Sequence, residues 1–391
     1  MRSKAGRNLW VTVAALALAL APCLSRAAGY GIGADLSFLK QQEDAGRKFK
    51  DAGAAKPGLE IFRAHGYSWV RLRLFHTPTS LPNSYAYTLA MAKQAKALGF
   101  RFLLDFHYSD TWADPGAQSL PKAWASLSHA VLQDSVYRYT RETLIGFAAA
   151  GAAPDMVQIG NEINNGMLWP DGRSADFAKL ADLIKAGVRG VDSASAGAMR
   201  PQVMLHIACG GDTTATKWFF DNAAGRGIDY DAIGQSYYPL WHGTPADLAR
   251  NLDMMGRRYA KDIWVVETAF SPYPQGGSPF PLTDAGQSAY LRHLDSLVRA
   301  TPNGRGKGWM WWEPTANEYL GTPRGLFDAQ LNARPALSAF DGMTALRPGG
   351  TRPRVTGTLL PSAGSGPGPG LLRADGRQAR GRNSGFVLKA F

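Results

Sequence analysis

Residues 68–106 read SWVRLRLFHTPTSLPNSYAYTLAMAKQAKALGFRFLLDF, and the fold of the chain follows from this segment. Its two ends are short apolar runs at 68–74 and 100–106, and the part between them, 85–98, has the longer amphipathic pattern of a helix. A strand, a helix and a second strand in this order predict parallel strands joined by a crossover helix. The segment therefore indicates an α/β protein with a parallel sheet.

The same alternation continues on both sides of this segment. Further strand-like runs lie at 31–36, 155–159, 202–207, 231–235, 263–266 and 308–312. Helical patterns separate the runs, at 59–64, 133–149, 175–191, 213–223, 245–259 and 284–299. Eight parallel strands with crossover helices favour closure into a (β/α)8 TIM barrel. An open doubly wound sheet would carry a glycine-rich nucleotide turn after its first strand, whereas this chain has SFLKQQEDAG there, at 37–46.

The amino-terminal segment 1–28 differs in composition from the rest of the chain. It begins with basic residues, continues with an apolar run at 9–21 and ends with small residues, which is the order of a cleavable signal peptide. The apolar run is shorter than the about 20 residues that span a bilayer, so we expect no stable membrane insertion after cleavage. The leader predicts export to the periplasm or the extracellular space.

The carboxyl-terminal segment 348–391 is dominated by Gly, Pro, Ser and Arg, without helical or strand periodicity. Such a composition buries too little apolar surface to fold, so we predict a disordered tail. Residues 29–347 then form a single catalytic domain, close to the ~250 residues plus insertions of such barrels. The leader carries +4 and the tail +6 of the +12 formal charge, which leaves +2 for the domain and gives no indication of a nucleic-acid partner.

Barrels of this kind carry their chemistry at the carboxyl-terminal ends of the strands and in the loops that follow. The residues at the predicted strand exits are polar or aromatic: Asp35, Arg73, Asp105, His107, Asn161, Glu162, His206, Ser236, Tyr237, Glu267, Trp312 and Glu313. Such a distribution predicts an active-site face at this rim of the barrel.

Two of these exits carry a glutamate directly after an apolar strand. VQIGNEINNG, at 157–166, ends its strand in Asn161 and Glu162, and IWVVETAFSP, at 263–272, ends its strand in Glu267. Cleavage of a glycosidic bond with retention takes two carboxyl groups about 5–5.5 Å apart, one protonated and one ionised. A single glutamate at a strand end is more often an ordinary residue, but two at matching positions beside aromatic residues predict a catalytic pair.

The glutamates stand within longer stretches that resemble the arabinogalactan endo-β-1,4-galactanases of glycoside hydrolase family 53, in the clan of retaining barrel glycosidases. The matching stretches are GADLS (33–37), VRLRLFHTP (70–78), LLDFHYSDTWADPGAQ (103–118), QIGNEINNGMLWP (158–170), SYYPLWHGT (236–244) and VVET (265–268). They are spread over almost all of the predicted domain. The blocks DFHYSDTWADP, at 105–115, and GNEINNGMLWP, at 160–170, are the specific ones.

This resemblance implies roles for individual residues. Glu162 would be the acid/base and Glu267 the nucleophile of a double displacement. Asn161 would hydrogen-bond the 2-hydroxyl of the sugar bound at the nucleophile.

The resemblance also implies that Arg73 and Tyr237 hold Glu267 ionised and oriented. A cation and a phenol hydroxyl both favour the charged form of a carboxyl group, which agrees with that role. Arg71 is an alternative to Arg73, because both residues face the same side of the predicted strand.

Aromatic and polar residues near the rim are candidates for sugar binding. Sugar rings expose apolar C–H faces that aromatic side chains cover well. The candidate platforms are Trp112, Trp124, Trp169, Trp241, Trp311 and Trp312, of which we expect about half to pack between helices and barrel. Trp241 and Trp312 are the strongest of them. Asp105, His107 and Asp110 could polarise sugar hydroxyls, although His107 could equally be an ordinary hydrogen-bonded strand-end histidine.

No cofactor or metal ion is expected. The loop TAFSPYPQGGSPFPLTD, at 268–284, follows the second glutamate strand and has a single carboxylate, Asp284, whereas some bacterial relatives carry an acidic calcium loop there. Calcium takes six to eight oxygen ligands, several of them charged, so we predict no calcium site. Cys209 is alone in the domain, which excludes an internal disulfide and a zinc cluster there.

The catalytic pair leaves the substrate open between an endo-galactanase, another retaining polysaccharidase (cellulase, mannanase or xylanase) and, less favoured, a non-catalytic polysaccharide-binding protein. The loops DFHYSDTWADP, at 105–115, and YYPLWHGT, at 237–244, favour β-1,4-galactan. We expect the polysaccharide substrate as partner, no nucleic acid, and a monomeric protein.

Overall fold

The computed structural model describes residues 29–271, 279–315 and 324–341. The predicted signal peptide 1–28 and the predicted tail 348–391 lie outside the described residues, as does 272–278 of the loop in which calcium ligands were sought. No helix of the described part is long and apolar enough to cross a membrane.

The described chain forms a closed barrel of eight parallel strands, as the alternation of strands and helices predicts. Around the barrel the order is β1-β12-β11-β10-β9-β6-β5-β4, so strands adjacent in the chain are adjacent in the sheet. Their bounds are β1 Gly31–Asp35, β4 Trp69–Leu74, β5 Arg101–Phe106, β6 Met156–Ile159, β9 Gln202–Ile207, β10 Ala232–Ser236, β11 Asp262–Thr268 and β12 Gly306–Trp312. The fold is a TIM barrel.

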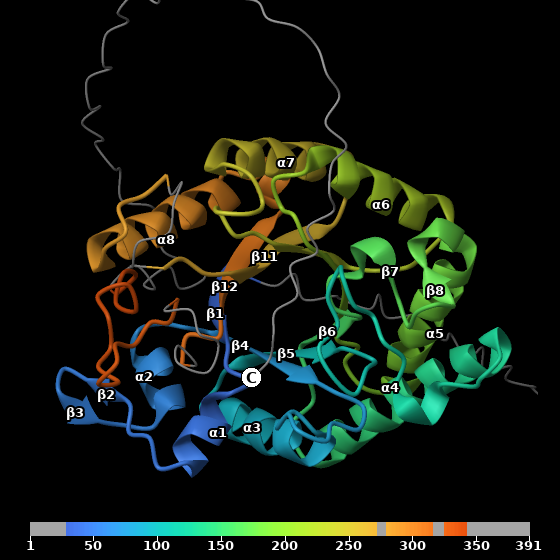
Figure 1. Cartoon of the computed structure of the whole chain (residues 1–391), viewed down its shortest axis with the longest axis horizontal. Coiled ribbons are helices and arrows are strands. Elements are labelled where there is room, and N and C mark those ends of the chain that lie inside the picture. Colours follow the sequence, from blue (N-terminus) through green and yellow to red (C-terminus); the bar gives the residue numbers. More distant parts are fainter. Residues whose placement is uncertain (1–28, 272–278, 316–323, 342–391) are drawn as a thin grey trace, which may run out of the picture.

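The helices form a ring outside the strands (Figure 1). In the described residues they are α1 Leu39–Asp44, α2 Gly58–Ala64, α3 Tyr85–Ala97, α4 His129–Ala149, α5 Phe177–Ala194, α6 Thr213–Gly225, α7 Pro245–Arg258 and α8 Asp284–Arg299. Local signals set several of their starts. Ser84 caps α3 and Asp212 caps α6, and Thr244 forms a capping box with Asp247 at the start of α7.

The short elements lie in the connections between the strands and helices. Helix α1 and the small hairpins were not among the predicted elements. The hairpin strands are β2 Lys50–Asp51 with β3 Ala54–Ala55, and β7 Gly166–Met167 with β8 Gly172–Arg173. The 3-10 turns are Lys122–Trp124, Ile163–Asn165, Ser174–Asp176 and Pro302–Gly304.

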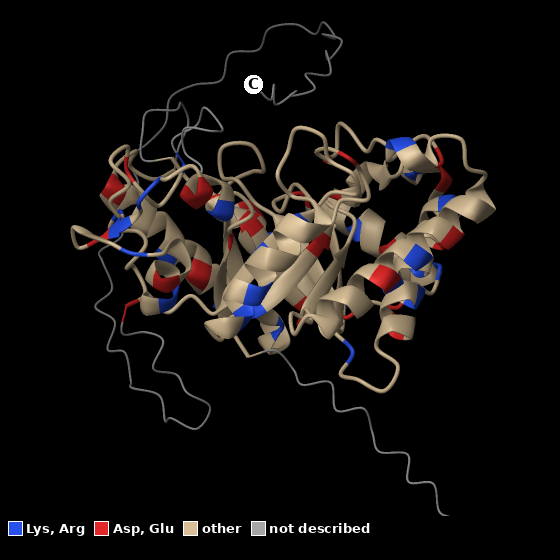
Figure 2. Cartoon of the chain, turned by 90° about the horizontal axis from the view of Figure 1, so that it is seen from below, with Lys and Arg blue, Asp and Glu red and all other residues tan. Residues whose placement is uncertain are grey.

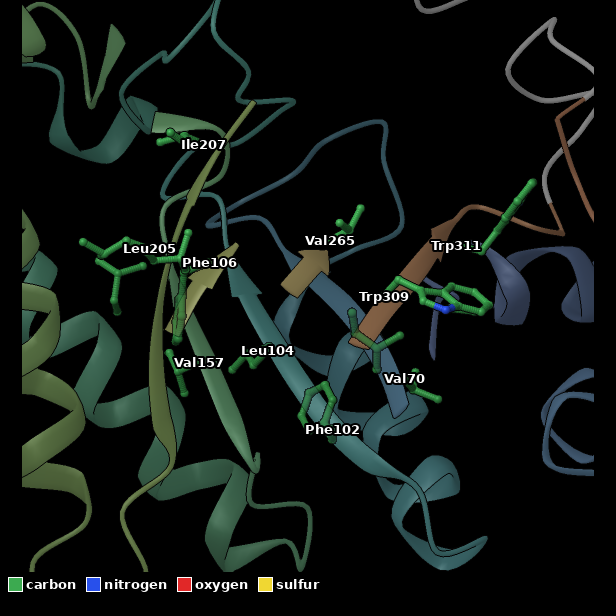
Figure 3. Close-up of a cluster of buried hydrophobic side chains, with 14 of the residues drawn as sticks. Val70, Phe102, Leu104, Phe106, Val157, Leu205, Ile207, Val265, Trp309 and Trp311 are labelled. Carbon is green, nitrogen blue, oxygen red and sulfur yellow. The ribbon is translucent and has the colours of Figure 1, made fainter. Parts of the chain in front are cut away.

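The barrel strands bury side chains on both faces. Outward-facing residues such as Val70, Leu104 and Trp309 pack in the layer between strands and helices (Figure 3). Residues of opposite phase fill the barrel interior, in a second cluster composed of Trp69, Leu103, Met156, Met204, Ala232, Trp264, Val266 and Met310. The apolar interior is therefore filled by packed side chains, and polar chemistry is confined to the rim.

Two glycines make room for the largest side chains of this interior. A Cβ atom at Gly31 would lie 2.4 Å from Cδ1 of Trp69, and one at Gly308 would lie 2.5 Å from Cζ3 of Trp264. Charged residues of both signs are interspersed over the elements of the barrel (Figure 2). This distribution agrees with the small net charge of the predicted domain.

Candidate active site

Arg71 lies at the centre of the polar layer that covers the barrel interior. Its Nη1 atom is 2.8 Å from Oδ2 of Asp35 and 2.6 Å from Oε1 of Glu267, and its Nη2 atom is 2.8 Å from Oδ2 of Asp105 and from Oδ1 of Asn161. Burial alone would lower the pKa of Arg71, but the three carboxylates raise it above its ordinary value. A fully buried cation thus fixes the positions of groups from four other strands or strand ends.

A β-bulge in β11 directs Glu267 into this layer. Gln235 of β10 pairs with Val265, whereas the next residue, Ser236, pairs with Glu267, so Val266 is one residue more than the register requires. In a regular strand Val266 and Glu267 would face opposite sides, yet Val266 belongs to the interior cluster and Glu267 contacts the interior Arg71. Bulges re-aim side chains beside active sites in this way.

The structure corrects the expected tyrosine partner of Glu267. The hydroxyl of Tyr238 donates to Oε2 of Glu267 at 3.3 Å, whereas the hydroxyl of Tyr237 donates to the Gly243 carbonyl at 3.1 Å. The cause is strand alternation after β10, since the inward phase of Ser236 continues at Tyr238 and not at Tyr237. Burial and the charge of Glu267 raise the pKa of Tyr238 well above its ordinary value, so the phenol keeps the proton that it donates.

The structure likewise selects Arg71 over Arg73 as the cation that pairs with Glu267. Arg73 instead forms an ion pair with Glu313, with Asp35 3.6 Å from the same nitrogen. Its guanidinium carbon lies against two rings, 4.5 Å from the centroid of Trp112 and 4.8 Å from that of Phe38. Both arginines face inward, as expected. Arg73 pairs with Glu313 and lies against Trp112, whereas Arg71 pairs with Glu267.

Glu162 follows β6 in a left-handed conformation, with φ 47° and ψ 52°. Burial raises the pKa of its carboxyl group to about 8, the charge of Glu267 adds to the rise, and a hydrogen bond with Ser236 opposes it. The pKa of Glu267 is also raised by burial, against the opposing effect of Arg71. The Ser236 hydroxyl contacts both carboxyl groups, which brings Glu162 and Glu267 to the same part of the rim.

A serine and a histidine connect the two glutamates. The Ser236 hydroxyl lies 3.4 Å from Oε2 of Glu267 and 2.8 Å from Nε2 of His206. The other ring nitrogen of His206, Nδ1, lies 3.0 Å from Nε2 of Gln158, 3.4 Å from the backbone nitrogen of Glu162 and 2.9 Å from Oδ1 of Asn161. The ring thus joins the Asn161–Glu162 turn to Ser236. Burial lowers the pKa of His206 well below its ordinary value, so the ring is neutral.

The remaining predicted polar residues serve mainly to build the rim. Asn161 donates to the Ala113 carbonyl at 2.8 Å while its oxygen accepts from Arg71. Asp105 is fully buried against Arg71 and lies 3.1 Å from Nε2 of His107. Asp110 accepts from two backbone N–H groups, of Thr77 and Lys122, and thereby joins two loops.

Four aromatic rings form a row beside Glu267. The distances between ring centroids are 6.4 Å from Trp112 to Trp312, 6.5 Å from Trp312 to Tyr238 and 5.7 Å from Tyr238 to Trp241. Trp241 is 48% exposed, and the guanidinium of Arg324 lies 4.9 Å from its ring. The row brings together three of the candidate sugar platforms, Trp112, Trp241 and Trp312.

The other tryptophan candidates do not join this row. Trp311 and Trp124 are buried, which makes them packing residues. Trp169 lies on the loop after Glu162, with the guanidinium of Arg173 3.9 Å from its ring. In residues 29–271, 279–315 and 324–341, no group of three or more His, Cys, Asp or Glu side chains is placed to hold a metal ion.

Sequence reasoning missed Tyr238, Gln158 and Gln118 at this rim. Counting on by two from Ser236 would have pointed to Tyr238. Gln158 lies inside a β-strand, where its donation to Asp105 at 2.6 Å depends on barrel closure. Gln118 lies in a long loop, and no local pattern marks it.

A closed parallel barrel with two buried glutamates and a row of aromatic rings at its carboxyl-terminal rim has the groups that a retaining glycoside hydrolase requires. The comparisons with known proteins specify the family. Residues 31–340 match the model of glycosyl hydrolase family 53, and the chain belongs to this family.

Relatives and solved structures agree with this assignment. The chain is 39% identical over 323 residues to the probable arabinogalactan endo-β-1,4-galactanase A of Aspergillus terreus, covering 78% of this chain and 91% of that protein. A fungal β-1,4-galactanase structure is similar with a TM-score of 0.76 and 32% identity, covering 80% of this chain and 99% of the other. The family 53 catalytic domain of Ignisphaera aggregans is similar with a TM-score of 0.74 and 32% identity, covering 82% and 98% of the respective chains.

Proposed function

We propose that the protein is an endo-acting galactanase that hydrolyses β-1,4-galactosidic bonds in galactan and arabinogalactan with retention of configuration. Glu267 is the nucleophile and Glu162 is the acid/base in this proposal. Relatives at 39% and 34% identity are named arabinogalactan endo-β-1,4-galactanases, which supports the substrate.

The observation that carries the assignment of roles is the different environment of the two glutamates. Glu267 has an arginine Nη1 atom 2.6 Å away and accepts a hydrogen bond from Tyr238, and both partners favour its charged form. Glu162 is the carboxyl group whose pKa is raised to about 8, by burial and by the charge of Glu267. The proton of the pair therefore resides on Glu162, as a general acid requires.

The chemistry then proceeds in two displacements. A carboxylate oxygen of Glu267 attacks the anomeric carbon and forms an ester, the bond to the leaving O4 breaks, and the proton of Glu162 moves to that oxygen. In the second step Glu162 takes a proton from water, the water oxygen attacks the same carbon, and the bond to Glu267 breaks. Two inversions give net retention.

Galactose differs from glucose in the axial hydroxyl at C4, which bends a β-1,4 chain away from the flat ribbon of cellulose. In β-1,4-galactan this axial oxygen carries the glycosidic bond, so a binding surface distinguishes the bent galactan chain from the flat cellulose chain by its shape. The row Trp112, Trp312, Tyr238 and Trp241 offers apolar faces along which such a chain stacks. We expect slower attack on chains with arabinose branches, which would clash with this surface.

Two further parts of the proposal rest on sequence and size. The segment 1–28 would direct the protein to the periplasm or the extracellular space, and the mature protein would act as a monomer. Amino-terminal sequencing of the exported protein tests the first part, and its mass in solution tests the second.

The catalytic pair is tested by Glu267→Ala and Glu162→Ala, with the exposed Glu60→Ala as a matched control. Each rim variant should lose at least about 10²- to 10⁴-fold in turnover of galactan while its melting temperature stays near that of the parent, and the control should keep its activity. Azide should restore turnover to the Glu267 variant and give a galactosyl azide of inverted configuration. Near-normal activity of either rim variant contradicts the assignment.

Substrate choice is tested with galactan, arabinogalactan, mannan, xylan and cellulose, scored by reducing ends released. The proposal expects galactan to be cleaved fastest and internally, with a rapid fall in viscosity. Comparable rates on cellulose or mannan would leave the catalytic pair standing and refute the substrate.

A further inference from the structure

The backbone at Glu162 determines the direction of its carboxyl group. Its φ of 47° and ψ of 52° lie in the left-handed region, which residues with a Cβ atom occupy uncommonly. A side chain on such a turn keeps its position only where surrounding contacts hold the turn. The groups that bind the backbone of Asn161 and Glu162 therefore decide where the acid/base proton is presented.

Gln118 supplies the principal contacts of this kind. The Nε2 atom of Gln118 donates to the carbonyl of Asn161 at 2.8 Å and lies 3.4 Å from the carbonyl of Glu162. The same atom also lies 3.1 Å from the carbonyl of Asp114. Gln118 is 2% exposed, so water does not compete for these hydrogen bonds.

The backbone of Gln118 is itself fixed. Its carbonyl accepts from the N–H of Trp169 at 2.7 Å, and the neighbouring Ser119 forms a bridge with Trp169. Gln118 thus joins the loop after β5 to the loop after β6 at two points, once through its side chain and once through its main chain. On the other side of the turn, the N–H of Glu162 lies 3.4 Å from Nδ1 of His206.

We infer that Gln118 is a positioning residue for acid catalysis, whose amide holds the Asn161–Glu162 turn so that the Glu162 carboxyl is aimed at the leaving oxygen. The inference rests on the proposed role of Glu162. Its consequence is specific, because a displaced acid affects only substrates whose leaving group needs a proton.

Two variants remove the hydrogen-bond donors of Gln118. Gln118→Met keeps the length of the side chain and Gln118→Leu keeps most of its volume, so that one of them is informative if the other fails to fold. Both are compared on galactan, whose leaving group is a sugar alkoxide, and on a 2,4-dinitrophenyl β-galactotrioside, whose leaving group departs without protonation. The quantity measured is kcat/KM, which reports the first displacement.

We expect kcat/KM on galactan to fall by about 10- to 100-fold in both variants, as for a catalytic group displaced by about 1 Å, and kcat/KM on the dinitrophenyl substrate to change by less than about 3-fold. The control Gln287→Met removes a buried amide that donates to the backbone carbonyls of Phe270 and Gly325, at 2.9 and 3.2 Å. It should lower stability without separating the two substrates.

Glu162→Ala distinguishes a failure of the inference about Gln118 from a failure of the proposed role of Glu162. If Glu162→Ala loses activity on galactan selectively but the Gln118 variants lose activity on both substrates equally, or on neither, the inference about Gln118 is overturned and the proposed role of Glu162 stands. If Glu162→Ala itself affects both substrates equally, Glu162 is not the acid and the inference falls with it.

Discussion

The hydrogen-bond donors around Glu267 include the guanidinium of Arg71 and the phenol of Tyr238, besides the Ser236 hydroxyl. Both stabilise its charged form, although burial raises its pKa. Because hydrogen bonds to charged groups are worth about 1.5–3 kcal/mol, the phenol contributes a measurable part of that stabilisation. Tyr237, the residue before Tyr238, also carries a phenol hydroxyl but donates it to a backbone carbonyl of the following loop.

The pair provides a matched test at the residue scale. Tyr238→Phe should lower kcat on galactan by about 10- to 100-fold, since the nucleophile loses a donor worth about 1.5–3 kcal/mol. Tyr237→Phe should leave kcat within about 2-fold and lower the melting temperature slightly. Steady-state kinetics and thermal unfolding of both variants check this, and an equal loss of kcat in the two would contradict it.

The pH dependence of the reaction should follow Glu162. Its pKa of about 8 means that kcat/KM falls as the pH rises through this value, because the general acid loses its proton. In Glu267→Gln the neighbouring negative charge is absent, so ionisation of Glu162 becomes easier and its pKa falls, while burial keeps it above the ordinary value. Carbon-13 NMR of labelled glutamate would measure both values, and an unchanged or higher pKa in the variant would refute the coupling.

Single residues of the rim could be predicted only in part. The sequence placed both glutamates at strand ends, since an apolar run followed by a carboxylate is a local pattern. It did not choose between Arg71 and Arg73, because alternation puts both inside and the choice depends on the loop that brings Trp112 over Arg73. The phase of the chain after Ser236 decided between Tyr237 and Tyr238, and that phase is set by the pairing of β10 with β11.

At the scale of elements, α4 and α5 are packed unusually closely because of a glycine. A Cβ atom at Gly190 of α5 would lie 2.7 Å from the carbonyl oxygen of Tyr137 and 2.8 Å from Cβ of Thr140, both on α4. Backbone atoms of a packed helix do not yield to such a contact without a shift. Gly225, the last residue of α6, has nothing within 4 Å of the same position.

Alanine at these two helical glycines should therefore act in opposite directions. Gly190→Ala is expected to lower the free energy of unfolding by about 1–3 kcal/mol through overpacking, despite the better helix propensity of alanine. Gly225→Ala is expected to raise it by about 0.5–1 kcal/mol. Urea denaturation measures both. Higher stability of both variants than of the parent would contradict the close packing of α5 on α4. Activity per folded molecule should be unaffected in both.

Long elements were predictable and irregular ones were not. The eight strands and the helices from α2 to α8 lie within a few residues of the segments expected from apolar periodicity. Helix α1 has only six residues, too few for a period to register, and the hairpins of β2–β3 and β7–β8 have two residues a strand. The bulge in β11 is invisible in VVET, because one extra residue in a buried strand leaves the apolar run intact.

At the scale of the whole molecule, the number and alternation of strands were sufficient to predict closure of the barrel. The predictions for the two ends of the chain rest on composition alone. Deleting 348–391 should leave the melting temperature and the activity on soluble galactan unchanged, because a Gly/Pro/Arg-rich segment buries little apolar surface. Calorimetry and reducing-end assays of the shortened protein test this expectation, and a loss of several degrees would mean that the tail packs on the barrel.

The left-handed backbone at Glu162 sets a limit on how robust this enzyme can be. A non-glycine residue in that region carries about 1–3 kcal/mol of strain, and the buried carboxyl group adds a further cost when it ionises. Glycine at position 162 would relieve both while leaving the aromatic row intact. The Glu162→Gly protein should therefore melt at a higher temperature than the parent, as scanning calorimetry can establish, and retain polymer without cutting it. Such a protein would suit affinity columns or fluorescent staining of galactan in plant tissue.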